Sequence, residues 1–300
     1  MASLPFSATK THPVFSDPFH EDAELGNALS KISTDPSLPE SITHTLKACR
    51  DTKSLQHAKV LHVNLCNTGM DDHEMLGNSI VVMFLDCQSL DMAQQAFNKL
   101  EYREEPAWTS LLHGYIEGKK YNQAFDLYKK MMNDHVHPSK YTFLAILKAC
   151  VKIKSLDRGR EIEGDIIKWK LEGDLFVGNA LVDMYAKCGS FNKAEEVLEV
   201  LIFQNISAWN ALIAGYVQYG KCDEAFNCVD KMRSKGLYPD ALTFSSILKA
   251  CGSVGSIDKG KQIHDEIIQK GLLEKNIVLG TAVVDMYAKC GEVAKAREAF

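Results

Sequence analysis

The side chains best placed for chemistry in this sequence are neutral amides and hydroxyls that recur at one kind of position. Each directly follows a glycine or a tryptophan of a recurring motif; they are Asn78, Thr109, Asn179, Asn210 and Thr281. Amides and hydroxyls donate and accept hydrogen bonds directionally and carry no charge. They therefore suit recognition of the polar edge of a planar ligand such as a nucleic-acid base.

The sequence contains no complete catalytic or metal-binding motif. The tripeptide His-Asp-Glu at 264–266 matches half of the zinc deaminase signature, but Pro-Cys-x-x-Cys is missing and no Cys-x-x-Cys occurs in the chain. Cys49, Cys150 and Cys251 stand where related segments have tyrosine, which predicts small core residues rather than metal ligands. We therefore expect no enzymatic activity, no cofactor and no metal, and we expect His264 to pack between segments.

Internal repetition indicates which elements position the amides and hydroxyls. Cys49, Cys150 and Cys251 each end an Ala-Cys pair and are 101 residues apart, and Trp108 and Trp209 keep the same spacing. Several residue types that share one spacing indicate a repeat array. We expect both tryptophans to pack inside it rather than to stack on a ligand.

One apolar stripe occurs three times within each 101-residue unit. Its members are spaced i, i+3, i+4 and i+7, starting for example at Trp108, Phe143 and Gly178. This is the period of an amphipathic helix, and a second helical pattern follows each stripe. The serines expected to cap second helices at their N-termini are Ser54, Ser155 and Ser256.

The resulting fold is all-α, a right-handed α-solenoid of stacked helix-turn-helix repeats. Residues 1–38 form an N-terminal extension, and residues 39–300 form the array. Its segments are 39–73, 74–104, 105–139, 140–174, 175–205, 206–240, 241–276 and 277–300. The last segment has 24 residues against 31 in its two counterparts. Because solenoids need polar terminal caps, we expect the sequence to be a fragment.

Composition excludes several other classes of protein. No apolar run is long enough for a transmembrane helix, and nine scattered cysteines without a signal-peptide core indicate reduced thiols. The net charge is −5, of which the array carries −2 from 32 basic and 34 acidic residues. An RNA or DNA ligand would therefore gain little from counterion release. We expect a shallow salt dependence, and a logarithmic slope of about −5 or steeper would contradict it.

Several segments resemble the pentatricopeptide repeat family. They are 207–216 (SAWNALIAGY), 236–240 (GLYPD), 178–189 (GNALVDMYAKCG) and 243–251 (TFSSILKAC). A repeat near 35 residues could also be tetratricopeptide, but these motifs favour the pentatricopeptide consensus. The alternation of 35, 35 and 31 residues resembles the plant P-L-S subclass, with segments in the order L, S, P, L, S, P, L and a truncated S. The resemblance implies single-stranded RNA binding in organelles at roughly one base per repeat.

The family pairs each base-reading residue with the last residue of its repeat. In the S and P segments this implies Asn78 with Glu104, Thr109 with Ser139, Asn179 with Asn205, and Asn210 with Asp240, while Thr281 has no partner. Asn with Asn favours cytosine, Asn with Asp favours uracil, and threonine favours a purine. Segments 175–205 and 206–240 should therefore read C then U from 5′ to 3′, whereas Glu104 departs from the usual partner.

The L segments carry different side chains at the same two positions. These are Thr43 with His73, Leu144 with Asp174, and Ser245 with Asn276. Leu144 cannot hydrogen-bond a base, so its repeat is expected to be a spacer or a stacking contact. Ser245 with Asn276 resembles an adenine reader. For any single polar residue in these pairs, a solvated first-turn position is the alternative.

The expected partners follow from the resemblance. They are single-stranded organellar RNA and a deaminase, from a partner protein or a C-terminal extension, for C-to-U editing; we expect neither DNA nor a membrane. Residues 1–16 are rich in serine and threonine without acids, as in a transit peptide, but arginine is absent from 1–38. Location in a mitochondrion or chloroplast therefore rests on the family. The rival hypothesis is a protein-interaction scaffold that uses the same groove.

Overall fold

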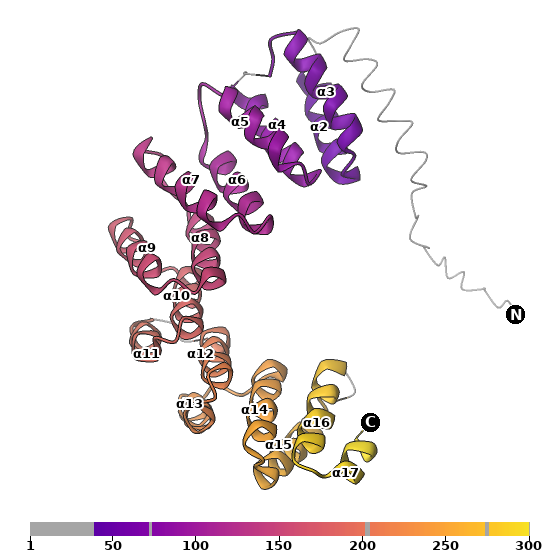
Figure 1. Ribbon diagram of the computed structural model, residues 1–300, viewed down its shortest axis with the longest axis vertical. Helices are drawn as coiled ribbons and strands as arrows, with labels where there is room; N and C mark the ends of the chain where they lie inside the picture. The colour runs from indigo at the N-terminus through magenta and orange to yellow at the C-terminus, as the bar shows by residue number, and fades with distance from the viewer. Residues whose placement is uncertain (1–38, 72–73, 202–204, 274–275, 300) are drawn as a thin grey trace, which may run out of the picture. The chain divides into compact units, whose positions relative to one another are not determined.

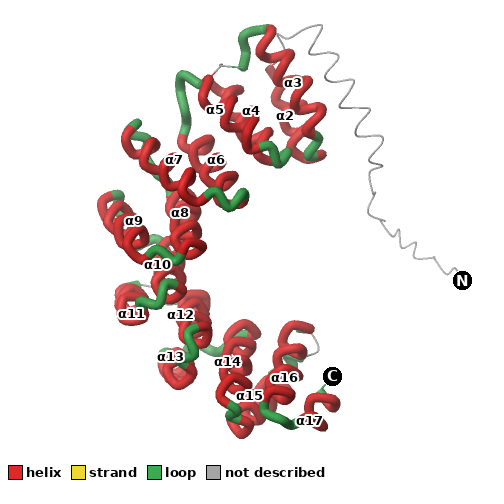
Figure 2. The backbone as a smooth tube through the Cα atoms, viewed as in Figure 1, coloured by secondary structure: helices red, strands yellow, loops and turns green. Residues whose placement is uncertain are grey.

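The computed structural model describes residues 39–71, 74–201, 205–273 and 276–299. All regular structure in these residues is helical (Figures 1 and 2), which confirms the all-α prediction. The helices follow one another in pairs: α2 (Pro39–Thr52) and α3 (Leu55–Asn67), α4 (Glu74–Asp86) and α5 (Leu90–Lys99), α6 (Glu105–Glu117) and α7 (Tyr121–Asn133), α8 (Lys140–Ile153) and α9 (Leu156–Lys168), α10 (Leu175–Lys187) and α11 (Phe191–Val200), α12 (Ile206–Gln218) and α13 (Cys222–Ser234), α14 (Ala241–Val254) and α15 (Ile257–Gln269), α16 (Ile277–Lys289) and α17 (Val293–Glu298).

The even-numbered helices are the first members of the pairs. They begin at residues 39, 74, 105, 140, 175, 206, 241 and 277, which are also the starts of the eight segments proposed from the sequence. None of the helices in the described part of the chain is both long and apolar enough to cross a bilayer.

The chain divides into two compact units, one up to Gly114 and one from Tyr115, with the boundary inside α6. In the first unit, α4 packs against α2, α3 and α5. In the second, the first helices α8, α10, α12, α14 and α16 form one layer in which each contacts the next. The second helices α9, α11, α13 and α15 form another layer, and each contacts the first helix of the following pair (Figure 1).

Polar contacts join neighbouring second helices. Arg233 of α13 lies 2.6 Å from Glu266 of α15, and Lys231 of α13 lies 3.6 Å from Glu195 of α11. The Tyr128 hydroxyl on α7 donates to Asp165 on α9 at 2.9 Å. Charged and polar side chains therefore link neighbouring second helices.

The predicted stripes form the core. Trp108 and Trp209 have 0% and 3% of their surface exposed, so they pack inside as expected. Cys49, Cys150 and Cys251 are fully buried. Burial raises the pKa of Cys49 and Cys150 to about 12 and of Cys251 to about 11, so these groups are neutral thiols at physiological pH. Their role as small core residues is confirmed.

Small residues allow the two helix layers to approach each other closely. A Cβ at Gly159 of α9 would lie 2.4 Å from the Met184 sulfur of α10, and Ala124, Ala194 and Ala225 are fully buried. His264 also packs between helices, because its Nδ1 lies 3.0 Å from the Tyr287 hydroxyl of α16. This confirms the packing role expected for that histidine.

The serine caps agree with the prediction in position and differ in their hydrogen bonds. Ser54, Ser155 and Ser256 all precede a second helix. Ser155 accepts a bond from the amide of Arg158, but neither Ser54 nor Ser256 makes a side-chain capping bond. The Ser54 hydroxyl instead lies 2.7 Å from His57 Nδ1, which takes the hydroxyl away from the helix terminus. Nothing in the structure explains the difference at Ser256.

Candidate nucleic-acid interface

The two residues of each predicted pair lie near the two ends of one repeat. The first lies on the fifth residue of a first helix, as Asn179 does on α10 and Asn210 on α12. The second directly precedes the next first helix, as Asn205 precedes α12 and Asp240 precedes α14. The second member therefore also serves as the N-cap of the following helix.

Asn179 and Asn205 are joined by a hydrogen bond. The Asn205 Oδ1 accepts from the amide of Ala208 at 3.0 Å, which caps α12. Its Nδ2 consequently faces Asn179 and donates to Asn179 Oδ1 at 3.1 Å. The Nδ2 of Asn179 has no hydrogen-bond partner among the described residues, and the residue is half-buried. The pair therefore presents unused N–H donors to solvent.

Asn210 and Asp240 form a tighter cluster with Thr243. Asn210 Nδ2 donates to Asp240 Oδ1 at 3.0 Å. The same oxygen accepts from the Thr243 amide at 2.9 Å, while the Thr243 hydroxyl lies 2.6 Å from Asn210 Oδ1 and 2.9 Å from Asp240 Oδ1. The Leu242 backbone amide also acts on this carboxylate, and Asp240 is exposed. The exposed carboxylate of Asp240 therefore keeps lone pairs that can accept from a ligand, while Asn210 beside it is buried, with 5% of the residue exposed.

The charge of Asp240 is set by these hydrogen bonds. Partial burial acts to raise the pKa of its carboxyl group, but the bonds from Thr243 and Asn210 outweigh burial and hold the pKa below the usual aspartate range. Asp240 is therefore an ionised carboxylate at neutral pH, which accepts hydrogen bonds and donates none.

Asn78 and Glu104 are brought together in another way. Asn78 Oδ1 accepts from the backbone amide of Glu104 at 3.1 Å, and its Nδ2 lies 3.5 Å from the carbonyl of Tyr102. Its amide is thus directed at the loop backbone and is buried, with 6% of the residue exposed. Glu104, which is not the usual partner residue of the family, thus meets Asn78 through its backbone amide, whereas Asn205 and Asp240 meet their partners through side chains.

The hydrogen bonds of other predicted residues lie within single helix termini. Thr109, in the first unit, donates to Glu105 at 2.6 Å, and Ser139, in the second, caps α8. Asn276 caps α16 through Leu279, and Ser245 makes no bond to it.

Three other predicted positions are Thr281, Leu144 and His73. The exposed Thr281 donates to the carbonyl of Ile277 at 3.0 Å. Leu144 is half-buried, and His73 lies outside the described residues.

Exposed apolar side chains beside the predicted base-reading positions were not anticipated from the sequence. They stand three residues before a predicted base-reading position, hence on the same helix face. They are Tyr141, Phe176, Leu242 and Val278, with 58% to 72% of each residue exposed. Apolar residues that recur in the first turn, outside the core stripe, are the signal that could have identified them.

Tyr141 and Phe176 share one cation although they belong to consecutive repeats. The Lys140 ammonium lies 5.4 Å from the centre of the Tyr141 ring and 5.1 Å from that of Phe176. It is also 4.0 Å from Asp174, the N-cap of α10. Two exposed rings and an ammonium therefore lie together beside Leu144, the reader position without a hydrogen-bonding group.

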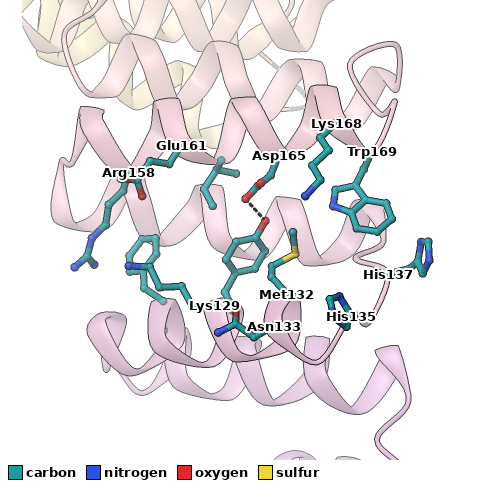
Figure 3. Close-up of a pocket in the computed structure, with 13 residues that line it drawn as sticks. Lys129, Met132, Asn133, His135, His137, Arg158, Glu161, Asp165, Lys168 and Trp169 are labelled. Carbon is teal, nitrogen blue, oxygen red and sulfur yellow. Dashed lines mark hydrogen bonds between the residues drawn. The ribbon is translucent and has the colours of Figure 1, made fainter.

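A cavity of about 600 Å³ lies in the other layer, between α7 and α9. Figure 3 shows Asp165, Lys168 and Trp169 on one side of it and Met132 on the other. The Trp169 ring packs edge-on against His137 at 4.4 Å. None of the predicted base-reading residues lines this cavity, so it is separate from the interface.

Family models match four stretches of the chain. A model described as the PPR repeat family matches residues 104–152 and 204–253, and one described as the PPR repeat matches 179–206 and 242–272. These stretches are pentatricopeptide repeats. They include the Asn179, Asn210 and Asp240 positions described above.

Similar proteins carry the same repeats. A mitochondrial pentatricopeptide repeat-containing protein of Arabidopsis thaliana is 30% identical over 85% of this chain and 40% of its own length. Another from Arabidopsis thaliana is 32% identical over 94% of this chain and 41% of its own length, and a chloroplastic one is 30% identical over 87% and 32%. This chain therefore spans well under half the length of these relatives.

Solved pentatricopeptide repeat structures have the same fold. The crystal structure of PPR10 in complex with an 18-nt psaJ RNA element matches with a TM-score of 0.71 at 15% identity, over 95% of this chain and 42% of that one. PPR10 from maize matches with a TM-score of 0.59 at 19% identity, over 96% and 46%. These likenesses establish the α-solenoid predicted from the sequence.

Proposed function

We propose that this chain binds single-stranded RNA sequence-specifically and forms the site-recognition part of an organelle C-to-U RNA-editing or RNA-processing factor of the P-L-S subclass. The observation that carries the proposal is the pair of hydrogen-bonded clusters at Asn179/Asn205 and Asn210/Asp240. In each cluster a hydrogen bond joins the two side chains of one repeat, and N–H groups of the amide side chains remain available to a base. The RNA complex of PPR10, which has the same fold, supports this choice of ligand.

The Asn179/Asn205 pair matches cytosine. The Watson–Crick edge of cytosine presents two acceptors, N3 and O2, beside the N4 amino group. Only one amide hydrogen of the pair is used in the bond between the two side chains. The other amide hydrogens can donate to the two acceptors of cytosine. The pair lacks the negative charge that would repel the N3 lone pair.

The Asn210/Asp240 pair matches uracil. Uracil has an N3–H donor between two carbonyl acceptors. The exposed carboxylate of Asp240 can accept from N3–H through a remaining lone pair, and the second amide hydrogen of Asn210 can donate to a carbonyl. Cytosine offers no hydrogen at N3, so the carboxylate would face a lone pair. Adjacent repeats therefore read C then U from 5′ to 3′.

The exposed side chains of the first turn supply binding that does not depend on sequence. Aromatic rings such as Tyr141 and Phe176 stack on any base, and a stacked base is worth about 1–3 kcal/mol. The Lys140 ammonium between them can approach a phosphate. The repeat with Leu144 would thus hold a base by stacking and leave its identity unread.

The other base-reading pairs carry less geometric support. Thr109 with Ser139 and Thr281 remain proposed purine readers, and Ser245 with Asn276 a proposed adenine reader. Asn78 is proposed to read a pyrimidine, with its amide bonded to the loop backbone beside Glu104.

The cellular setting is part of the proposal. Several relatives are named as mitochondrial or chloroplastic proteins, which supports an organellar location. The chain is proposed to contribute recognition and no catalysis, so that a deaminase on another segment or on a partner protein would carry out editing.

Equilibrium binding to two short single-stranded RNAs tests the proposal. The RNAs are identical except that C-U, placed where residues 175–240 would read it, is replaced by A-G. The chain should prefer C-U, and Asn179→Thr/Asn210→Thr should move the preference toward A-G, because threonine favours a purine in this family. Absence of binding to either RNA would remove the support for RNA recognition and favour the scaffold hypothesis.

A further inference from the structure

A cluster of three potential metal ligands lies in the first unit, away from the base-reading pairs. His62 and Cys66 are one turn apart on α3, and Asp71 follows the end of that helix. One ligand atom from each of the three side chains lies within 4.8 Å of the other two. None of the three is among the buried cysteines or forms a Cys-x-x-Cys pair, the features from which the sequence predicted no metal.

Local backbone structure explains why the three side chains meet. A spacing of four residues places His62 and Cys66 on the same face of α3. Gly69 then adopts a φ of +67°, and the amide of Met70 donates to the carbonyl of Leu65 at 2.9 Å. This turn brings Asp71 back to the last turn of α3.

The separations between the ligand atoms suit a tetrahedral ion. Zinc binds sulfur at about 2.3 Å and imidazole nitrogen at about 2.0–2.1 Å, so a tetrahedral angle puts the two ligand atoms roughly 3.5 Å apart. His62 Nε2 and Cys66 Sγ are 3.5 Å apart. Cys66 Sγ and Asp71 Oδ2 are 3.1 Å apart as a hydrogen bond and would have to separate by a few tenths of an ångström.

We propose that His62, Cys66 and Asp71 bind a thiophilic divalent cation of the zinc class, with a fourth coordination position left to water. The ligand set of one imidazole, one thiolate and one carboxylate is within the chemistry of zinc sites. The ion would tie the end of α3 to the turn that leads toward α4. This inference does not depend on RNA binding.

The protonation of the ligands determines how the ion would bind. Burial lowers the pKa of His62, so its imidazole is neutral and has a free lone pair at neutral pH. Burial and the hydrogen bond to Asp71 raise the pKa of Cys66, so its thiol is protonated without the ion. As the metal–sulfur bond forms, the thiol proton is released to solvent.

Lys99 at the end of α5 is the group that competes with the cation. Its ammonium lies 3.7 Å from Asp71 Oδ2 and 4.0 Å from Cys66 Sγ. Its side chain is 58% exposed, so it can turn into solvent when the ion binds. Removing this charge should strengthen metal binding, which a merely structural cluster would not predict.

Titration of the reduced full chain with Co²⁺ tests the proposal. A thiolate-to-cobalt charge-transfer band and the visible bands of tetrahedral Co²⁺ should appear, and Zn²⁺ should abolish both. Cys66→Ser should remove the charge-transfer band, and His62→Ala should weaken binding about ten-fold or more. Lys99→Met should tighten it about ten-fold.

Cys188→Ser is the matched control. Cys188 is also partly exposed, and no group of potential metal ligands in the described residues includes it, so this variant should bind Co²⁺ as the unaltered chain does. Circular dichroism without metal would show that each variant is folded. The proposal is overturned if the unaltered chain lacks the band, if Cys66→Ser retains it, or if Lys99→Met fails to tighten binding.

Discussion

Exchanging a carboxylate and an amide between two adjacent repeats should exchange the bases they prefer. Asp240→Asn gives the repeat at 206–240 the same pair of side chains as its neighbour, and Asn205→Asp does the reverse. Both positions are N-caps, and asparagine and aspartate are about equally good caps, so neither change should disturb the following helix. The double variant should therefore fold like the unaltered chain and prefer U then C.

The size of the effect follows from one hydrogen bond. The Asp240 carboxylate would accept from uracil N3–H, and a hydrogen bond to a charged group contributes about 1.5–3 kcal/mol. Asp240 is exposed, so the lower end applies. About 1.5 kcal/mol corresponds to roughly a ten-fold change in the ratio of affinities for uracil and cytosine at that position.

The assay is fluorescence anisotropy with two RNAs that differ only in the order C-U or U-C, so that they have the same composition and charge. Asp174→Asn is the control. Asp174 is also an N-cap aspartate, and it accepts from the amides of Phe176 and Val177, but its partner position is Leu144. This change should leave the preference between the two RNAs unaltered.

One result would refute the argument. If Asp240→Asn weakens binding to both RNAs equally and leaves their ratio unchanged, Asp240 acts only as a helix cap. The hydrogen bond with Asn210 would then stabilise the repeat without contributing to base selection.

Three further predictions concern the scaffold. Gly215→Ala should destabilise the chain by about 1–3 kcal/mol, because the new Cβ would lie 2.7 Å from Ala186 Cβ and 3.2 Å from the Ala186 backbone. Gly164→Ala, whose Cβ would have nothing within 4 Å, should instead stabilise α9 by about 0.5–1 kcal/mol. Denaturant unfolding of the two variants measures both changes. Ser139→Ala should cost about 1 kcal/mol because two amides lose their acceptor, while Ser256→Ala, which removes no capping bond, should change the unfolding midpoint little. Because the folded-state pKa of Asp240 is lowered, its contribution to stability is present above the unfolded aspartate pKa of about 3.9 and disappears as pH falls through the folded value. The difference in thermal midpoint between the chain and Asp240→Asn should therefore stay constant from neutral pH to about 5 and shrink as the pH falls below about 3.9.

Helices and core positions were predictable because they depend on periodic patterns. The stripe that begins at Trp108 or Phe143 specifies which face is buried, whatever the neighbouring side chains do. The spacing of Ala-Cys pairs and tryptophans predicted which residues share an environment in different repeats.

Individual hydrogen bonds were not predictable, since they depend on rotamers and on how loops return. Ser54 and Ser155 occupy equivalent positions, yet the Ser54 hydroxyl lies against His57 and only Ser155 caps its helix. Asn78 and Asn179 likewise look equivalent in the sequence, but the amide of Asn78 is directed at the backbone near Glu104. The approach of Asp71 to Cys66 depends on the turn at Gly69, which no side-chain pattern reveals.

The double role of Asn205 would make neighbouring repeats cooperative. Its Oδ1 holds the first turn of α12, while its Nδ2 holds the reader on α10. A base bound there would restrict one side chain that belongs to both repeats, so it would also order the first turn that carries Asn210. Occupying one repeat would lower the entropic cost of occupying the next, and RNA would bind as a contiguous run that grows along the array from any starting point.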